Sequence, residues 1–428
     1  MIDLGFRGYK FTWNNKRPGA ANNRERLDRA VANKEWLDRF SVSSVSHIFS
    51  HASNHMPLIL QIGMDNRFQG RMARGFKFEE RWLLEEECGI VVEEAWGWMG
   101  GADSPMVDVS SKINHCGAML DAWGSMRTKP EVAEIKRLKK VLESLHEGDQ
   151  NETTRSEFMA ASKKLDDLLL KQELYWAQRS RFSWLKSGDK NTKFFHSKVS
   201  QRHRKNFIQG IKNSKGVWVD RIEDVAEVAV QYFENLFSSG TCDWVEDCLN
   251  AVNHRLSSNM LNILLEEFSA DEVKTALFQM SPTKTLGPDG MNALFYQKFW
   301  HIVSNDVTNA VLDFLNTGFM LLELNYTHIV LIPKVKSPEK MSDFKPISLC
   351  NVIYKIISKV LANKLKLILP QLISPSQSAF VPGQLITNNV LVANETLHAV
   401  HGPKKGKKGA IALKLDISKA YDKVKCPF

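Results

Sequence analysis

Residues 414–424 read KLDISKAYDKV, and the expected fold is built outward from this stretch. The apolar run over 410–415 predicts a buried strand, and Ser418 can cap a short helix after it. Asp416 would then stand where a strand gives way to a helix. A carboxylate at such a point can bind a hard cation such as Mg²⁺. A capping or turn role for Asp416 fits the same position.

The stretch resembles the first catalytic motif of reverse transcriptases of non-LTR retrotransposons, the LINE type found in plants. The resemblance implies that Asp416 is a catalytic residue that binds Mg²⁺. It implies that Tyr421 and Ile417 contact the incoming nucleotide, with Tyr421 screening the sugar 2′ position. The implied partners are an RNA template, a DNA primer and a dNTP as the small-molecule substrate.

Two-metal phosphoryl transfer needs carboxylates from more than one strand to hold the ions. In the family, the other carboxylates come from a Tyr- or Phe-x-Asp-Asp hairpin downstream of the first motif. The one Asp-Asp of this sequence, Asp166-Asp167, lies far upstream in a helical pattern. We therefore expect the chain to be inactive alone, as a fragment truncated at both ends.

The 428 residues carry a formal net charge of +9 and six cysteines, and no CxxC pair is present. The charge permits nucleic-acid binding. Cys242, Cys248 and His254 are evenly spaced, but free or structural thiols are favoured over a metal site. The sequence shows no secretory signal and no apolar run of membrane-spanning length. We expect no membrane partner and a location in the nucleus or cytoplasm.

Residues 1–64 show short strand patterns, including 26–32, and end on a strand pattern after the polar stretch SHASNH. Their order resembles the C-terminal part of the endonuclease/exonuclease/phosphatase fold, which precedes reverse transcriptase in these elements. The resemblance implies that Asp28 pairs with His55, and a carboxylate can hold an imidazole in orientation and charge. The alternative is a surface histidine and a strand-end aspartate.

Residues 65–265 are expected to form a mainly helical, basic linker. Apolar spacing predicts two long helices over 131–179, broken at EGDQN and packed as an antiparallel hairpin. A hairpin with a Lys-Gly turn and an amphipathic helix over 221–237 are expected to follow. Tryptophans 82, 96, 98 and 123 are interpreted as core or helix-packing residues.

Between Arg179 and Lys205, nine Lys or Arg stand against one acid, and four aromatic residues are interleaved with them. Basic groups neutralise phosphates and aromatic rings can stack on unpaired bases. The alternative is a basic surface helix whose aromatic residues face a core. The candidate nucleic-acid-binding residues are Lys186, Lys193, Arg202 and Arg204.

Residues 266–428 resemble the N-terminal part of a reverse transcriptase domain, with the fingers and the first palm motif. The sequence predicts a capped helix over 268–280, a Gly-Pro-Asp-Gly turn, a strand over 328–337, and a strand and long helix over 343–369. The resemblance implies that Lys334 and Lys345 approach the nucleotide triphosphate.

The predicted class is therefore α+β: a nuclease-like β remnant, a helical linker and partial reverse transcriptase fingers and palm. The expected function is that of a fragment of a LINE-type RNA-directed DNA polymerase. The alternatives are a non-enzymatic nucleic-acid-binding fragment and an inert product of a degraded retroelement gene.

Overall fold

The structure is a computed structural model. It describes residues 1–6, 8–17, 21–40, 43–48, 53–62, 75–98, 104–127, 132–147, 152–180, 199, 201–202, 205–238, 256–373, 381, 383, 385–401 and 411–413. These residues form helices and small two-stranded antiparallel sheets, so the mixed helix and strand character of the prediction is confirmed. No helix within the described ranges is long and apolar enough to span a membrane.

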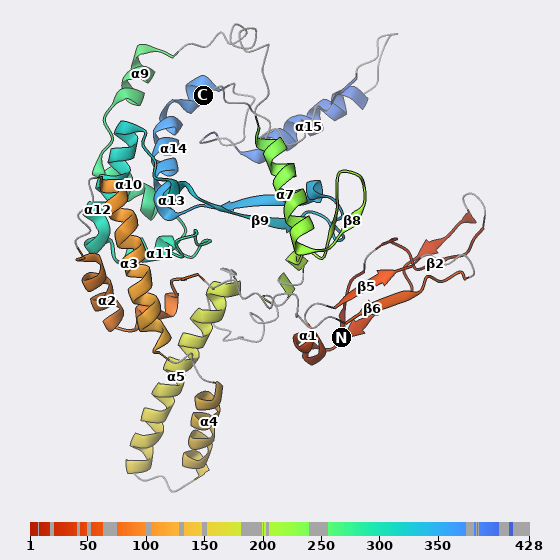
Figure 1. Ribbon diagram of the computed structural model, residues 1–428, viewed down its shortest axis with the longest axis horizontal. Coiled ribbons are helices and arrows are strands. Elements are labelled where there is room, and N and C mark those ends of the chain that lie inside the picture. The colour runs from red at the N-terminus through yellow and green to blue at the C-terminus, as the bar shows by residue number, and fades with distance from the viewer. Residues whose placement is uncertain are drawn as a thin grey trace.

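The first 62 residues form a group of short β ribbons that lies to one side of the helices (Figure 1). Three antiparallel pairs make up the group: β1 (Ile2–Asp3) with β4 (Val31–Ala32), β2 (Trp13–Asn14) with β3 (Arg24–Glu25), and β5 (Ser44–His47) with β6 (Leu58–Gln61). Helix α1 (Lys34–Arg39) connects β4 to β5, and the Asn33 side chain caps it by accepting from Trp36 N.

The two long helices predicted over 131–179 are confirmed. Helix α4 (Val132–Glu147) and helix α5 (Glu152–Ser180) pack side by side and extend away from the other helices (Figure 1). Ile135 and Leu138 of α4 are buried, as the helical spacing of apolar residues requires. Lys164 of α5 pairs with Glu134 of α4 at 3.1 Å.

A single hydrophobic core joins helices that are far apart in the sequence. Its buried residues come from two segments, 78–120 and 273–360. The main helices around it are α2 (Glu87–Trp96), α3 (Pro105–Ser125), α10 (Ala270–Phe278), α11 (Ala293–Lys298), α12 (Trp300–Thr317) and α14 (Val352–Leu372). The core therefore crosses residue 265, where the sequence predicts a domain boundary; the domain division itself stays a prediction.

Asp306 of α12 adds polar contacts to this junction. Trp96 Nε1 and Lys112 Nζ donate to its Oδ2 at 2.8 and 2.9 Å, which links α2 and α3 to α12. The predicted cap of α10 is also confirmed, because Ser269 and Glu272 form a capping box.

The predicted Gly-Pro-Asp-Gly turn, residues 287–290, lies between two other segments of the core. Gly290 has φ +74° and its carbonyl accepts from Phe78 N at 2.9 Å. A Cβ on Gly290 would lie 2.0 Å from the carbonyl oxygen of Phe76, and a Cβ on Gly287 would lie 2.4 Å from Asn351 Oδ1. Only glycine fits at either position.

A second, smaller core lies under the ribbon of β9 (His328–Pro333) and β10 (Phe344–Leu349). Ile211, Met341 and Phe344 are buried in it. The elements that supply residues 208–233 of this core are β7 (Ile211–Lys212), β8 (Trp218–Val219) and α7 (Ile222–Phe237). The predicted Lys-Gly turn between β7 and β8 is present, with Gly216 at φ +77°.

The remaining elements are short, except for α15. They are η3 (Glu80–Leu84), α9 (Ser258–Leu265), α13 (Leu322–Asn325), η4 (Met341–Asp343) and α15 (Ile386–His401).

Two local predictions of strands need correction. The strand predicted over 26–32 is limited to Val31–Ala32, because the backbone N–H of Asp28 donates to the Thr12 hydroxyl at 2.9 Å instead of to a strand carbonyl. Of the strand predicted over 410–415, residues 411–413 are described; they carry no strand pairing, and Ile411 is 91% exposed. Of the four tryptophans predicted as core or helix-packing residues, Trp98 is 44% exposed and stacks on His115 of α3, so it packs against a helix and does not enter the core.

The glycine contact in the 287–290 turn can be tested with a matched pair of variants. Gly290 and Gly318 have nearly equal positive φ, +74° and +75°, but nothing lies within 4 Å of a Cβ built on Gly318. Gly318→Ala should cost about 1 kcal/mol of the free energy of unfolding, from backbone strain alone. Gly290→Ala should cost about 3 kcal/mol or more, because it also clashes with the Phe76 backbone. Equal losses in urea unfolding would show that the close contact is absent.

Candidate functional site

Asp28 and His55, predicted as a pair, lie in direct contact in the structure. His55 Nδ1 donates to Asp28 Oδ2 at 2.9 Å, across 27 positions of sequence. A bridge between Trp13 and His55 and a hydrogen bond from Asn14 N to Asn54 O, 3.0 Å long, hold the histidine loop against β2. The side chains are 37% and 51% exposed, so solvent or a ligand can reach the pair.

Thr12 supports the pair and was missed by the sequence interpretation. It is fully buried, and its hydroxyl accepts from Asp28 N at 2.9 Å. The hydrogen bond from His55 lowers the pKa of the Asp28 carboxyl, and a side-chain hydrogen bond with Thr12 lowers it further. No local signal marks Thr12, because it stands between Phe11 and Trp13 and the alternation of a strand would place these aromatic residues, not the threonine, on the buried face.

The geometry suits a general base or acid. A carboxylate that accepts from Nδ1 fixes the tautomer of the imidazole and leaves Nε2 for proton transfer. The hydrogen bonds to the Asp28 carboxylate favour its ionised form, which is the form that accepts from Nδ1.

The two predicted nucleotide-contacting lysines lie at one end of the β9–β10 ribbon. Lys345 is exposed on β10, opposite Ile332 of β9. Lys334 follows β9; its backbone N donates to Asp343 O at 2.8 Å and its Nζ to Ser342 O at 3.1 Å. Both lysines therefore lie near the end of the ribbon where β9 leads into the loop before β10.

Several predicted residues lie outside the described part of the chain. They are Asp416, Ile417, Tyr421, Lys186, Lys193 and Arg204. Arg202 is described and exposed. The predicted roles of all seven stay predictions.

The described residues alone do not supply a site that fits a catalytic metal ion. No cluster of three or more His, Cys, Asp or Glu side chains within the described ranges could hold one. The predicted Mg²⁺ ligand, Asp416, is outside those ranges, and we derive no step through a metal from this geometry.

Comparison with known proteins identifies the C-terminal part of the chain. Residues 332–428 match the family described as reverse transcriptase (RNA-dependent DNA polymerase). This segment is similar to a reverse transcriptase domain. The matched segment begins at the last two residues of β9 and includes β10, α14, α15 and the KLDISKAYDKV stretch. Reverse transcriptases bind nucleic-acid templates and primers and use divalent metal ions.

A second comparison covers nearly the whole chain. Over 410 residues, 91% of this chain, the sequence is 25% identical to the Transposon TX1 uncharacterized 149 kDa protein of Xenopus laevis. The matched part is 30% of that protein, so the chain spans less than a third of the relative's length. The similarity begins well before the reverse transcriptase match, and it supports a retroelement origin for the chain.

The core beside the reverse transcriptase sequence contains an ionisable group that the sequence interpretation treated only as a turn residue. Asp289 Oδ1 accepts from Met291 N at 3.0 Å, while Oδ2 is buried with no hydrogen-bond partner among the described residues. The hydroxyl of Tyr296 is likewise buried and without such a partner. Burial raises the pKa of the Asp289 carboxyl to about 6, although the positive charge of Lys355 opposes the rise.

Asp289 gives a pH-dependent stability with a definite sign. The folded pKa of about 6 exceeds the ordinary value of 3.8, so the folded state prefers the neutral carboxyl. The stabilisation that this protonation gives is complete below about pH 4 and is lost as the pH rises through 6. Asp289→Asn keeps the Oδ1 acceptor but cannot ionise.

Relative to Asp289→Asn, the wild-type chain should therefore lose up to about 3 kcal/mol of unfolding free energy between pH 4 and pH 7. Urea unfolding at a series of pH values measures the difference, with Asp220→Asn at an exposed position as the control. Parallel pH profiles for the wild type and Asp289→Asn would contradict the assignment.

Proposed function

We propose that the chain supplies the fingers and first palm motif of an RNA-directed DNA polymerase of a LINE-type retrotransposon. The observation that carries the proposal is the reverse transcriptase match at 332–428, which includes KLDISKAYDKV. The similarity to a transposon protein over 91% of the chain supports the retroelement assignment. The substrates are a dNTP, an RNA template and a DNA primer.

The proposed reaction joins the primer 3′ oxygen to the α-phosphate of the dNTP and releases pyrophosphate. In this role Asp416 is a Mg²⁺ ligand, and Tyr421 and Ile417 contact the sugar of the incoming nucleotide. Lys334 and Lys345 neutralise the triphosphate, a role supported by their position at one end of the ribbon. Both lysines can act as point charges toward phosphate.

The first 62 residues are proposed to be a relative of the endonuclease/exonuclease/phosphatase fold. The contact between Asp28 and His55 supports this, since it unites two residues that the resemblance pairs. The buried Thr12 beneath Asp28 gives the pair the rigid support that an acid–base site needs.

A non-enzymatic nucleic-acid-binding chain is the second candidate, and the charge of residues 179–205 favours it. The described Asp-Asp pair, Asp166-Asp167, is in α5 on the projecting hairpin, not in a strand hairpin beside the predicted Asp416. Two-metal catalysis needs further carboxylates beside Asp416, because a single carboxylate supplies too few ligands to fix two ions. We propose that the 428 residues alone bind RNA and do not extend a primer.

Primer extension on an RNA template separates the candidates. A chimera that adds a related Asp-Asp hairpin segment after Phe428 should extend the primer, whereas the 428-residue chain should not. In the chimera, Asp416→Asn should lower extension by at least about a hundredfold, because it removes a metal ligand. Tyr421→Ala should increase ribonucleotide incorporation.

Lys215→Gln, on the exposed β7–β8 turn, is the control and should leave extension unchanged. A chimera that folds and binds primer-template but extends equally well with Asn at position 416 would overturn the polymerase assignment.

A further inference from the structure

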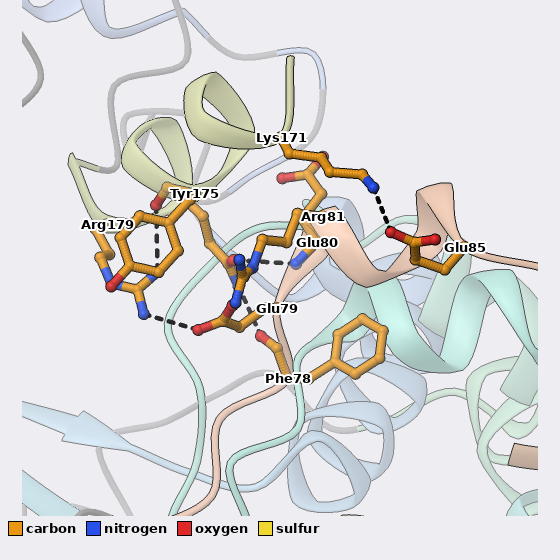
Figure 2. Close-up of polar contacts among 9 residues, drawn as sticks. Phe78, Glu79, Glu80, Arg81, Glu85, Lys171, Tyr175 and Arg179 are labelled. Carbon is orange, nitrogen blue, oxygen red and sulfur yellow. Dashed lines mark hydrogen bonds and ion pairs between the residues drawn. The ribbon is translucent and has the colours of Figure 1, made fainter. Parts of the chain in front are cut away.

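Basic side chains can meet an anion only where carboxylates do not already pair with them. At the end of α5, Glu79 accepts from Arg81 and from Arg179 (Figure 2). Lys171 of the same helix pairs with Glu85. Residues 334–345, at the turn from β9 to β10, differ, and we call them the lysine loop. Within the described residues no carboxylate pairs with its lysines, which are Lys334, Lys336, Lys340 and Lys345.

The two acids of the lysine loop are engaged elsewhere. The Glu339 carboxylate pairs with Lys212 of β7. Asp343 Oδ2 accepts from the backbone N–H groups of Glu339 and Lys340, each at 3.0 Å. Asp343 N also donates to Lys340 O at 2.9 Å. A carboxylate that accepts from two neighbouring backbone N–H groups forms strong hydrogen bonds, so Asp343 closes the loop on itself.

Asp343 also joins the two strand ends that carry Lys334 and Lys345. Its carbonyl accepts from Lys334 N at 2.8 Å. Next to this bond, Pro333 lies opposite Phe344, and both are buried. Side chains alternate between the two faces of a strand, so Lys345 lies on the outer face and the position of Lys334 falls on the same face. Asp343 therefore fixes the backbone between the two lysines.

The lysine loop rests on the second core. Met341 within the loop and Phe344 are buried together with Ile211. Lys212 N donates to Glu339 O at 2.7 Å, so β7 also holds the backbone of the loop. The exposed lysines are therefore carried by a backbone that is packed from below and closed from within by one carboxylate.

We propose that Asp343 is a positioning residue for a triphosphate, because it shapes the lysine loop so that Lys334 and Lys345 meet the anion together. The inference rests on the proposed function, in which these two lysines neutralise the triphosphate of the nucleotide. A negative group beside an anion site would by its charge alone weaken binding. Asp343 strengthens binding instead, since a backbone that is already ordered loses less entropy when the lysines bind.

The test measures the binding of inorganic tripolyphosphate and of dTTP to the full 428-residue chain by calorimetry, without divalent cations. Three changes separate charge from geometry. Asp343→Asn removes the charge and keeps an acceptor, Asp343→Glu keeps the charge and displaces the acceptor, and Asp343→Ala removes both. Circular dichroism and thermal unfolding check the fold. The Asn and Glu variants decide the test if the Ala variant unfolds.

Asp343→Ala and Asp343→Glu should raise the Kd for both probes roughly three- to tenfold, the effect of losing two hydrogen bonds that order the loop. Asp343→Asn should bind at least as tightly as the wild type. With Lys334→Gln and Lys345→Gln in the background, neither the Ala nor the Glu change should weaken the residual binding, because both act through these lysines. Amide exchange of Glu339 and Lys340 should become faster in the Ala and Glu variants only.

If the carboxylate acts only as a charge, the Ala and Asn variants will bind more tightly and the Glu variant will match the wild type. That result would overturn the positioning role and leave the role of the lysines intact. Equal weakening by Asp343→Ala in both backgrounds would also overturn it. So would the expected order with tripolyphosphate but not with dTTP, because the loop would then bind a free polyphosphate. Binding of dTTP that Lys334→Gln with Lys345→Gln leaves unchanged would refute the proposed role of the lysines, and the inference with it.

Discussion

No side chain fits between Gly290 and the backbone of Phe76, and the arrangement of the helices depends on that contact. The turn at 287–290 accepts from Phe78 N on one side. On the other side Asn351, at the start of α14, accepts from Asp289 N and donates to Glu323 O and Leu324 O. Segments that are distant in sequence therefore meet at this turn, through one backbone hydrogen bond to Phe78 and through the Asn351 side chain, which pairs three further backbone groups. Backbone N–H and C=O groups must be paired when they are buried. The hydrogen bonds at the 287–290 turn therefore fix the relative positions of these segments.

The contact between Phe78 and the 287–290 turn also explains why residues 78–120, which the sequence analysis assigns to a linker, belong to the main hydrophobic core. Phe78 and Trp82 enter the core beside Phe295, and α2 and α3 then cover α12. The end of α5 is held against the segment before η3, because Gln178 Nε2 donates to Phe78 O. The basic stretch of the sequence, residues 179–205, begins in the last residues of α5. The N-terminal ribbons contact this body through Ser337, after β9, which donates to Phe6 O at 3.0 Å.

Local patterns predicted the elements well. Helical spacing gave α4 and α5, Ser269 and Glu272 marked the start of α10, and the Lys-Gly turn marked the β7–β8 hairpin. Contacts between distant residues were harder to predict. Nothing local to Thr12 indicates that its hydroxyl holds Asp28, and a Gly-Pro-Asp-Gly turn has the same sequence whether its Asp is exposed or buried. The pairing of Asp28 with His55 was predicted only because a family resemblance supplied the long-range link.

Hydrogen exchange of the full chain in low concentrations of urea tests most directly whether residues 75–127 and helices α12 and α14 form one body. The account predicts that amides of α2, α3, α12 and α14 share one opening free energy and one urea dependence, because a single core holds them. Exchange of α2 and α3 through a separate opening of lower free energy, with α12 and α14 still protected, would contradict it.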